Sequence, residues 1–206
     1  MRNTVKGALV AAAAFTAAAG FALAPATATT TATWTASPGG AWTAKAASPK
    51  LTDTRTGTKL TCTSSSAAGV LSSGNGLPIS TITSIGWTSC SGPLGIVFTV
   101  TPQNLPWGIN ALTYNAGTGV TTGTVTGVKA HISGAGCNAD FAGPTSTTPA
   151  TLTGTYSNST NTLTISGGDL HAYGVSGSCL GLLNNNDPAT YNAAYVLSAP
   201  QSITSP

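Results

Sequence analysis

An alternation of apolar and polar residues with a period of two constrains this chain more than any other feature. The run Lys59-Leu60-Thr61-Cys62 and the run Thr162-Leu163-Thr164-Ile165 show it clearly, and glycine or proline interrupts almost every window long enough for three helical turns. Successive side chains of a strand point to opposite faces, so the pattern predicts half-buried β-strands rich in Thr, Val and Ile. The alternating segments are 51–55, 59–63, 79–85, 96–101, 120–128, 151–156, 162–165 and 191–197.

Turn-forming clusters separate these segments at short intervals. Examples are Thr56-Gly57, Ser73-Gly74-Asn75-Gly76 and Gly167-Gly168, which have the residues that tight turns prefer. Strands that follow one another without helices between them indicate antiparallel connections. The sequence therefore predicts an all-β fold, an antiparallel β-sandwich or barrel, with at most one short helical turn, at residues 179–184.

The first residues are typical of a secretory signal peptide. Arg2 and Lys6 precede an uncharged, alanine-rich run, and Ala26-Thr27-Ala28 supplies the small-x-small pattern of a cleavage site. We place cleavage after Ala28, so that residues 1–28 are the signal peptide and residues 29–206 are a single secreted domain, extracellular or associated with the cell wall. The run is too weakly hydrophobic to favour a membrane anchor, and none is expected once the signal is removed.

Four cysteines follow the predicted signal: Cys62, Cys90, Cys137 and Cys179. An even number in an exported chain predicts two disulfides, for which three pairings are possible. We favour Cys62 with Cys90 and Cys137 with Cys179, because sequential pairing keeps each loop local. No two cysteines have the C-x-x-C spacing of a zinc site, and the oxygen-rich run 184–187 lacks the closing Glu of a calcium loop, so no metal or cofactor is expected.

Charged residues are sparse. The whole chain has a net charge of +3, of which Arg2 and Lys6 contribute two, so the predicted mature domain has a net charge of +1. Proteins that bind nucleic acid need several Lys or Arg side chains to displace phosphate counterions, so a nucleic-acid partner is not expected. The oligomeric state has no signature in the sequence.

Two tryptophans near the predicted mature start form the first candidate site. Trp34 and Trp42 flank Ser37-Pro38-Gly39-Gly40, which has strong turn chemistry. If both rings lie on one exposed face, they form a platform for a cell-wall or extracellular glycan. The alternative is that both tryptophans pack in the core.

The histidines form the second candidate site. Asp169 and His171 are two positions apart, which places them on one face of a strand. With His131 and Asp140 nearby, they would provide the acid-base pair or the metal ligands of a secreted hydrolase. A surface ion pair is the alternative, and no G-x-S-x-G motif marks a nucleophile.

Several short segments resemble a group of small secreted proteins from filamentous actinomycetes such as Streptomyces. The resemblance rests on segments 32–40, 60–62, 90–95, 105–107 and 202–206. It extends over nearly all of the predicted mature chain, and it implies export and a single β domain but no activity. The sequence favours a non-catalytic extracellular protein, either a cell-surface constituent or a glycan-binding module. A secreted hydrolase and a β-barrel pore of an outer envelope are the alternatives.

Overall fold

The alternating sequence produces alternating burial along the strands. The strand β2 (Gly40–Ala47) turns Trp42, Ala44 and Ala46 inward, whereas the residues between them are exposed. The computed structural model describes residues 33–134 and 136–205, so the predicted signal peptide and its cleavage site lie outside the described residues. The other strands are β1 (Thr35–Ser37), β3 (Lys50–Asp53), β4 (Lys59–Leu71), β5 (Ser80–Ser91), β6 (Val97–Gln103), β7 (Trp107–Asn115), β8 (Val120–Gly134), β9 (Cys137–Ala142), β10 (Ala150–Ser157), β11 (Thr162–Gly168), β12 (Leu170–Gly177), β13 (Pro188–Leu197) and β14 (Ser202–Thr204).

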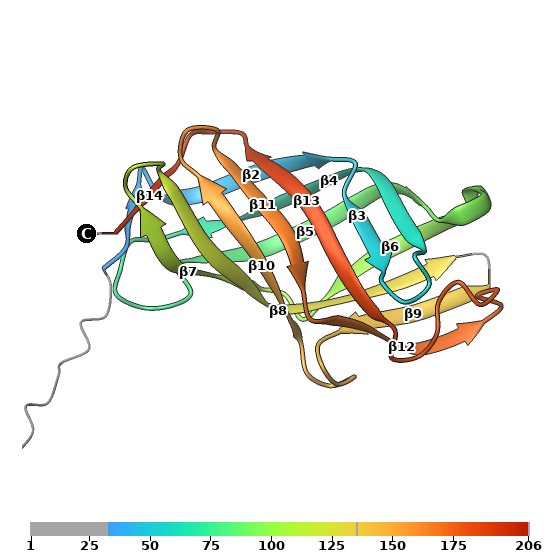
Figure 1. Cartoon of the computed structure of the whole chain (residues 1–206). Coiled ribbons are helices and arrows are strands. Elements are labelled where there is room, and N and C mark those ends of the chain that lie inside the picture. Colours follow the sequence, from blue (N-terminus) through green and yellow to red (C-terminus); the bar gives the residue numbers. More distant parts are fainter. Residues whose placement is uncertain (1–32, 135, 206) are drawn as a thin grey trace, which may run out of the picture. The chain divides into compact units, whose positions relative to one another are not determined.

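Strands β2 to β13 form one twelve-stranded sheet in which every pairing is antiparallel (Figure 1). Strands β1 and β14 form a separate two-stranded sheet. The predicted all-β, antiparallel class is confirmed. No helix in the part of the chain that the structure describes has the length and apolar character needed to cross a membrane.

The large sheet closes on itself, because its four longest strands pair with different partners along their length. In one half the pairing runs β2, β4, β5, β7, β8, β10, β11, β13 and back to β2. In the other half it runs β3, β4, β5, β6, β8, β9, β12, β13 and back to β3. Of the predicted sandwich and barrel, the strand pairing shows the barrel. A closed sheet has one inner face, and the core is built on that face.

Both disulfides have the predicted pairing. Cys62 is bonded to Cys90 and joins β4 to β5, whereas Cys137 is bonded to Cys179 and joins β9 to the loop that follows β12. All four cysteines belong to the buried core. The second disulfide therefore fixes a loop at the end of the sheet where β3, β6, β9 and β12 lie.

The helical turn expected at residues 179–184 does not form. Leu180 and Gly181 both have positive φ, at 53° and 70°, which a right-handed helix does not allow. The segment Pro93–Gly95 has the hydrogen bond of a single 3-10 turn, but Leu94 and Gly95 also have positive φ, at 58° and 74°, so it is not a right-handed helical turn either. Both segments are turns at the same end of the closed sheet, where the candidate site lies.

Candidate functional site

An apolar cavity of about 360 Å³ opens at the end of the sheet formed by β3, β6, β9 and β12. We call it the mouth cavity. Three connections form its rim: the β3–β4 turn, the β5–β6 turn and the loop between β12 and β13, which lie at the same end of the sheet in Figure 1. Its lining residues are Leu51, Asp53, Thr58, Lys59, Leu60, Gly92, Pro93, Ile96, Phe98, Ile132, Cys137, Phe141, Ser178, Cys179, Leu180, Leu182 and Leu183. The volume is within the range of small-molecule sites, roughly 300–1,000 Å³.

Smaller apolar gaps continue from the mouth cavity along the inner face. The first, about 60 Å³, shares Leu51, Leu60, Ile132 and Phe141 with the mouth cavity. The next, also about 60 Å³, shares Trp107, Leu152 and Tyr191 with the first. The inner face is therefore loosely filled in a series of gaps that begins at the mouth.

Polar groups on the inner face bind one another. The Tyr191 and Tyr195 hydroxyls lie 2.7 Å apart, Tyr195 contacts the Ser65 hydroxyl at 2.8 Å, and Trp87 Nε1 donates to Tyr191 at 2.9 Å. Burial raises the pKa of Tyr195 and raises the pKa of Tyr191 well above its ordinary value, so both hydroxyls stay neutral. These gaps consequently offer a ligand mainly hydrocarbon surface.

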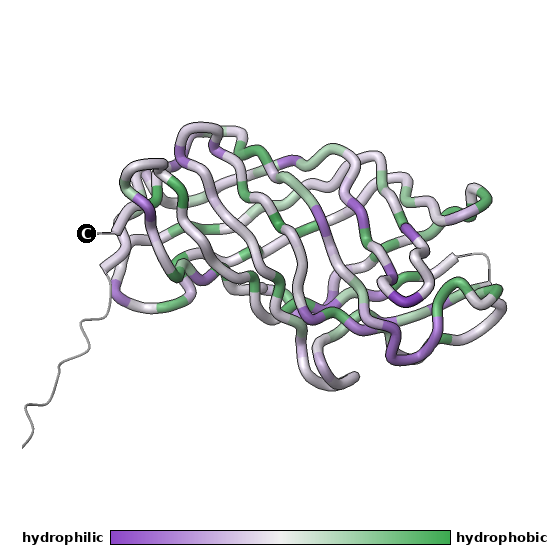
Figure 2. Tube along the Cα trace, in the orientation of Figure 1, coloured by the Kyte–Doolittle hydropathy of each residue, from purple (hydrophilic) through white to green (hydrophobic). Residues whose placement is uncertain are grey.

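Two turns on the rim present exposed leucines. In Pro93-Leu94-Gly95-Ile96 and in Cys179-Leu180-Gly181-Leu182, the central Leu and Gly both have positive φ. The fourth residue of each turn donates its N–H to the carbonyl of the first, at 3.2 Å and 2.9 Å. Leu94 is 91% exposed and Leu180 is 64% exposed. We call these the leucine turns, and Figure 2 shows apolar colour at both of these connections.

The leucine turns share a backbone conformation that leucine rarely adopts. Positive φ at both central residues defines a type I′ turn, in which Asn-Gly and Asp-Gly are the preferred pairs. A left-handed conformation costs a residue with a Cβ roughly 1–2 kcal/mol. Both Leu94 and Leu180 carry that cost, so the backbone conformation of the turns does not explain why leucine is present. The feature that the two residues share is that both are exposed on the rim of the mouth cavity.

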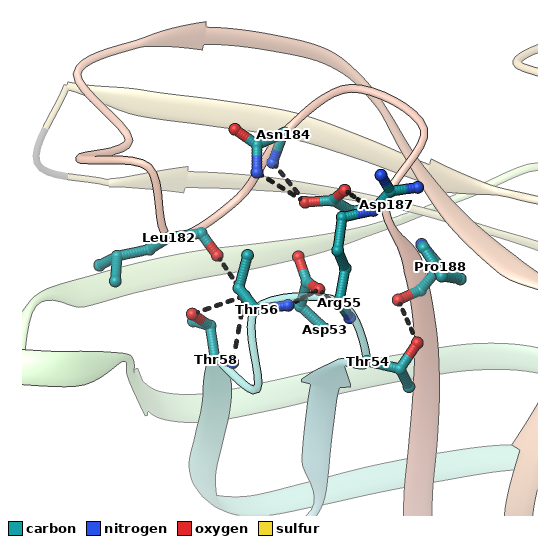
Figure 3. A network of polar contacts seen from close by, with 9 residues as sticks. All are labelled: Asp53, Thr54, Arg55, Thr56, Thr58, Leu182, Asn184, Asp187 and Pro188. Carbon is teal, nitrogen blue, oxygen red and sulfur yellow. Dashed lines mark hydrogen bonds and ion pairs between the residues drawn. The ribbon is translucent and has the colours of Figure 1, made fainter.

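A polar network joins two parts of the rim (Figure 3). Asp187 Oδ1 lies 2.8 Å from Nε of Arg55, and its Oδ2 accepts hydrogen bonds from N and Nδ2 of Asn184 at 2.8 and 2.9 Å. Burial raises the pKa of Asp187, but the hydrogen bonds from Asn184, a contact with the Asp53 carboxyl group and the charge of Arg55 together hold it below its ordinary value of 3.8. The network fixes the β3–β4 turn against the loop that precedes β13.

Asp53 belongs to both the network and the cavity. Its Oδ1 accepts hydrogen bonds from the backbone N–H groups of Arg55 and Thr56, at 2.8 and 2.9 Å, and these bonds shape the β3–β4 turn. The Thr56 hydroxyl in turn donates to the Leu182 carbonyl at 2.9 Å. Asp53 is buried and lines the mouth cavity, so a carboxyl group is held in a mainly apolar wall.

One family matches most of the chain. The family model described as alkane oxidation protein activator PraA/PraB-like matches residues 1–191. The chain belongs to this family. Comparison with curated proteins and with solved structures gives no match. The predicted resemblance to actinomycete proteins is not tested by these comparisons, and the PraA/PraB-like family is the relationship they establish.

In this PraA/PraB-like chain the predicted tryptophan platform is not exposed. Trp34 and Trp42 are both buried in the core, and Trp42 Nε1 donates to the Ser80 hydroxyl at 2.9 Å. Trp42 lines an inner gap. Neither ring can stack on a glycan from solvent, because Trp34 is only 4% exposed and Trp42 lies on the inward side of β2. The expectation of an exposed platform is corrected here.

The four residues of the predicted hydrolase site are only partly brought together. His131 Nδ1 lies 2.8 Å from Asp140 Oδ1, and the two residues are paired across β8 and β9 on the outer side of the sheet. The Asp169 carboxylate instead accepts a hydrogen bond from the backbone N–H of Thr151, at 2.6 Å. His171 contacts the backbone carbonyl of Asp169, so the predicted carboxylate–imidazole pair does not form. Among the described residues there is no group of three or more metal-ligating side chains.

Sequence reasoning missed the mouth cavity. The missed residues are spread over β3, β4, β6, β8, β9 and three connections, and only the closure of the sheet brings them together. One signal was available, namely the two Leu-Gly pairs at Leu94-Gly95 and Leu180-Gly181, each within a segment of turn residues. Exposed leucines in tight turns indicate an apolar contact outside the core.

Proposed function

We propose that this PraA/PraB-like protein is a non-catalytic extracellular protein that binds a long-chain hydrocarbon in the mouth cavity. The alkyl chain would enter between the leucine turns and lie against Leu60, Ile132 and Phe141. The observation on which the proposal depends is the cavity of about 360 Å³ at one end of the closed sheet, with a mainly apolar wall. The description of the family, alkane oxidation protein activator, supports the same class of ligand.

The shape of the inner face favours a long, narrow ligand. A flexible alkyl chain can extend from the mouth cavity into the gaps of about 60 Å³ that share its wall. Small apolar gaps that stay dry favour hydrocarbon over water, because water needs polar partners. Transfer of each methylene from water to such a wall contributes about 0.8 kcal/mol to binding.

The leucine turns support the proposal from outside the cavity. Leu94 and Leu180 lie on the rim and leave most of their side-chain surface in water. Apolar residues in such positions lower their free energy when they contact an apolar surface. They would give the alkyl chain an apolar route into the mouth cavity.

The two disulfides support an extracellular location. Disulfides persist in oxidising compartments and are rare in the reducing cytosol. They join β4 to β5 and β9 to the β12–β13 loop, and the second of them also lines the mouth cavity. A fixed rim would keep the cavity open without a bound ligand.

Binding of labelled n-hexadecane to the purified, oxidised protein tests the proposal. We expect saturable, one-to-one binding measured by co-elution on gel filtration. Ile96 lines the cavity at the rim, so Ile96→Trp should fill the entrance and abolish binding. Val196 is exposed on β13 and does not line the cavity, so Val196→Trp adds the same ring elsewhere and should leave binding unchanged.

The result for the unaltered protein decides the proposal. No saturable binding of n-hexadecane to folded protein would overturn it. Equal loss of binding in both tryptophan variants would also contradict it, because the binding would then not depend on the mouth cavity.

A further inference from the structure

Among the described residues, two buried side-chain oxygens have no hydrogen-bond partner: Asp53 Oδ2 and Thr121 Oγ1. Buried polar atoms are almost always paired, so each of these atoms calls for an explanation. Thr121 lines a gap of only about 30 Å³. Asp53 lines the mouth cavity, which is about 360 Å³ and therefore large enough for a ligand.

The unpaired oxygen of Asp53 is held in place by the paired one. Hydrogen bonds from the backbone N–H groups of Arg55 and Thr56 fix Oδ1, at 2.8 and 2.9 Å. Asp53 as a whole is only 4% exposed. Bulk water therefore solvates the carboxylate poorly, and rotation to satisfy Oδ2 would break the turn.

The donors of the Arg55–Asp187 network are engaged elsewhere and do not bond to Asp53 Oδ2. Arg55 Nε pairs with Asp187, and Nδ2 of Asn184 also donates to Asp187. The Asp53 and Asp187 carboxyl groups can bond one another only when one of them holds a proton. Asp53 Oδ2 has no hydrogen-bond partner among the described residues, and it belongs to a residue that lines the mouth cavity.

We propose that the mouth cavity is selective for a long-chain primary alcohol, whose hydroxyl donates a hydrogen bond to Asp53 Oδ2 while its alkyl chain extends toward Ile132 and Phe141. This inference rests on the proposed function, since it names the ligand class of the same cavity. A bare alkane leaves Oδ2 unpaired. A hydroxyl supplies the one donor that is missing, and leaving a buried acceptor without a partner costs free energy.

Other polar head groups fit the site less well. A carboxylate would be repelled by the ionised Asp187, and because Arg55 is already paired it would have to pair with Lys59, the exposed cation of the cavity wall, which leaves Asp53 Oδ2 without a donor. An ammonium group has three donors, whereas Asp53 Oδ2 is the one unpaired buried side-chain acceptor among the described residues that line the cavity, so the match in number is poorer than for a hydroxyl. One donor on an uncharged chain end is the best match.

The test compares n-hexadecane with hexadecanol on the full, oxidised chain. We expect the unaltered protein to bind the alcohol about tenfold more tightly than the alkane, since pairing one buried acceptor that was unpaired contributes about that much. Asp53→Asn keeps an oxygen at Oδ1 for the turn and replaces Oδ2 by an amide nitrogen. In this variant the preference should fall to about twofold or less.

Thr121→Val is the matched control, because it removes the other unpaired oxygen and should leave the preference unchanged. Equal affinity for alcohol and alkane in the unaltered protein would overturn the alcohol inference. Failure to bind either compound would overturn the proposed function itself. If Asp53→Asn does not fold, as judged by circular dichroism, the affinity ratio of the unaltered protein still decides the question.

Discussion

The guanidinium Nε of Arg55 lies 2.8 Å from Oδ1 of Asp187, and the two side chains differ greatly in burial. The Arg55 side chain is 64% exposed, whereas that of Asp187 is 1% exposed. Water screens the pair from one side only, and Asn184 gives Asp187 two further hydrogen bonds. The contact between the β3–β4 turn and the β12–β13 loop therefore depends mainly on the Asp187 carboxylate.

Removing either member should lower the free energy of unfolding by unequal amounts. We expect Arg55→Ala to cost about 1 kcal/mol, because solvent already weakens the ion pair. Asp187→Ala should cost about 3 kcal/mol, because it breaks a buried, hydrogen-bonded network. Urea denaturation with both disulfides intact measures both values. Lys45→Ala is the control, because Lys45 is exposed on β2. If Arg55→Ala and Asp187→Ala lower the free energy of unfolding equally, Asp187 is not the dominant member of the pair.

Stability should fall in acid through Asp187. The folded state holds the pKa of this group below its ordinary value of 3.8, so the folded protein binds the proton less tightly than the unfolded chain. Its contribution is complete above that ordinary value and is lost as the pH falls through the folded pKa. Denaturation midpoints measured between neutral pH and pH about 2 should show a decline below pH about 4. The decline should be smaller in Asp187→Asn, and an equal decline in both proteins would rule out Asp187 as its source.

The sequence predicted the parts of this fold that local chemistry determines. Alternation predicted strands, and the even cysteine count predicted both disulfides with the pairing Cys62–Cys90 and Cys137–Cys179. Closure of the sheet was not predictable, because it depends on β4, β5, β8 and β13 changing partners along their length. The alternation along β2 also shows that Trp42, Ala44 and Ala46 lie on the same face of the strand, but it does not show which face points into the core.

The candidate site was less predictable than the fold. Ionisable residues drew attention to His131 and His171, but the mouth cavity consists mainly of aliphatic and aromatic side chains that look like ordinary core residues in the sequence. Asp53 and Asp187 are separated by most of the chain, and their proximity follows from the pairing of β3 with β13. A network of this kind is visible only once the strand register is known.

Gly69 should tolerate no side chain. It lies at an irregularity in the pairing of β4 with β5, and a Cβ there would be 1.8 Å from the Thr81 carbonyl oxygen and 2.7 Å from Trp42 Cζ2. Gly69→Ala should therefore lower the free energy of unfolding by about 3 kcal/mol. Gly86 on β5 is the matched control, because a Cβ there meets nothing within 4 Å. Gly86→Ala should leave stability unchanged or raise it by about 0.5 kcal/mol in the same urea titration, and similar losses in the two variants would contradict the close approach at Gly69.

Replacing the leucines of the leucine turns should separate stability from binding. Leu94 has φ 58° and ψ 18°, and Leu180 has φ 53°, which are conformations that asparagine adopts more readily. Leu94→Asn and Leu180→Asn should together raise the free energy of unfolding by about 1 kcal/mol and weaken the binding of n-hexadecane, because the rim loses its apolar contacts. Leu112→Asn, at a leucine that is exposed on β7 and does not line the mouth cavity, should leave binding unchanged. If the double variant gains stability and binds n-hexadecane as tightly as before, the leucines have no role in ligand entry; if it loses stability, the turn conformation has been misjudged.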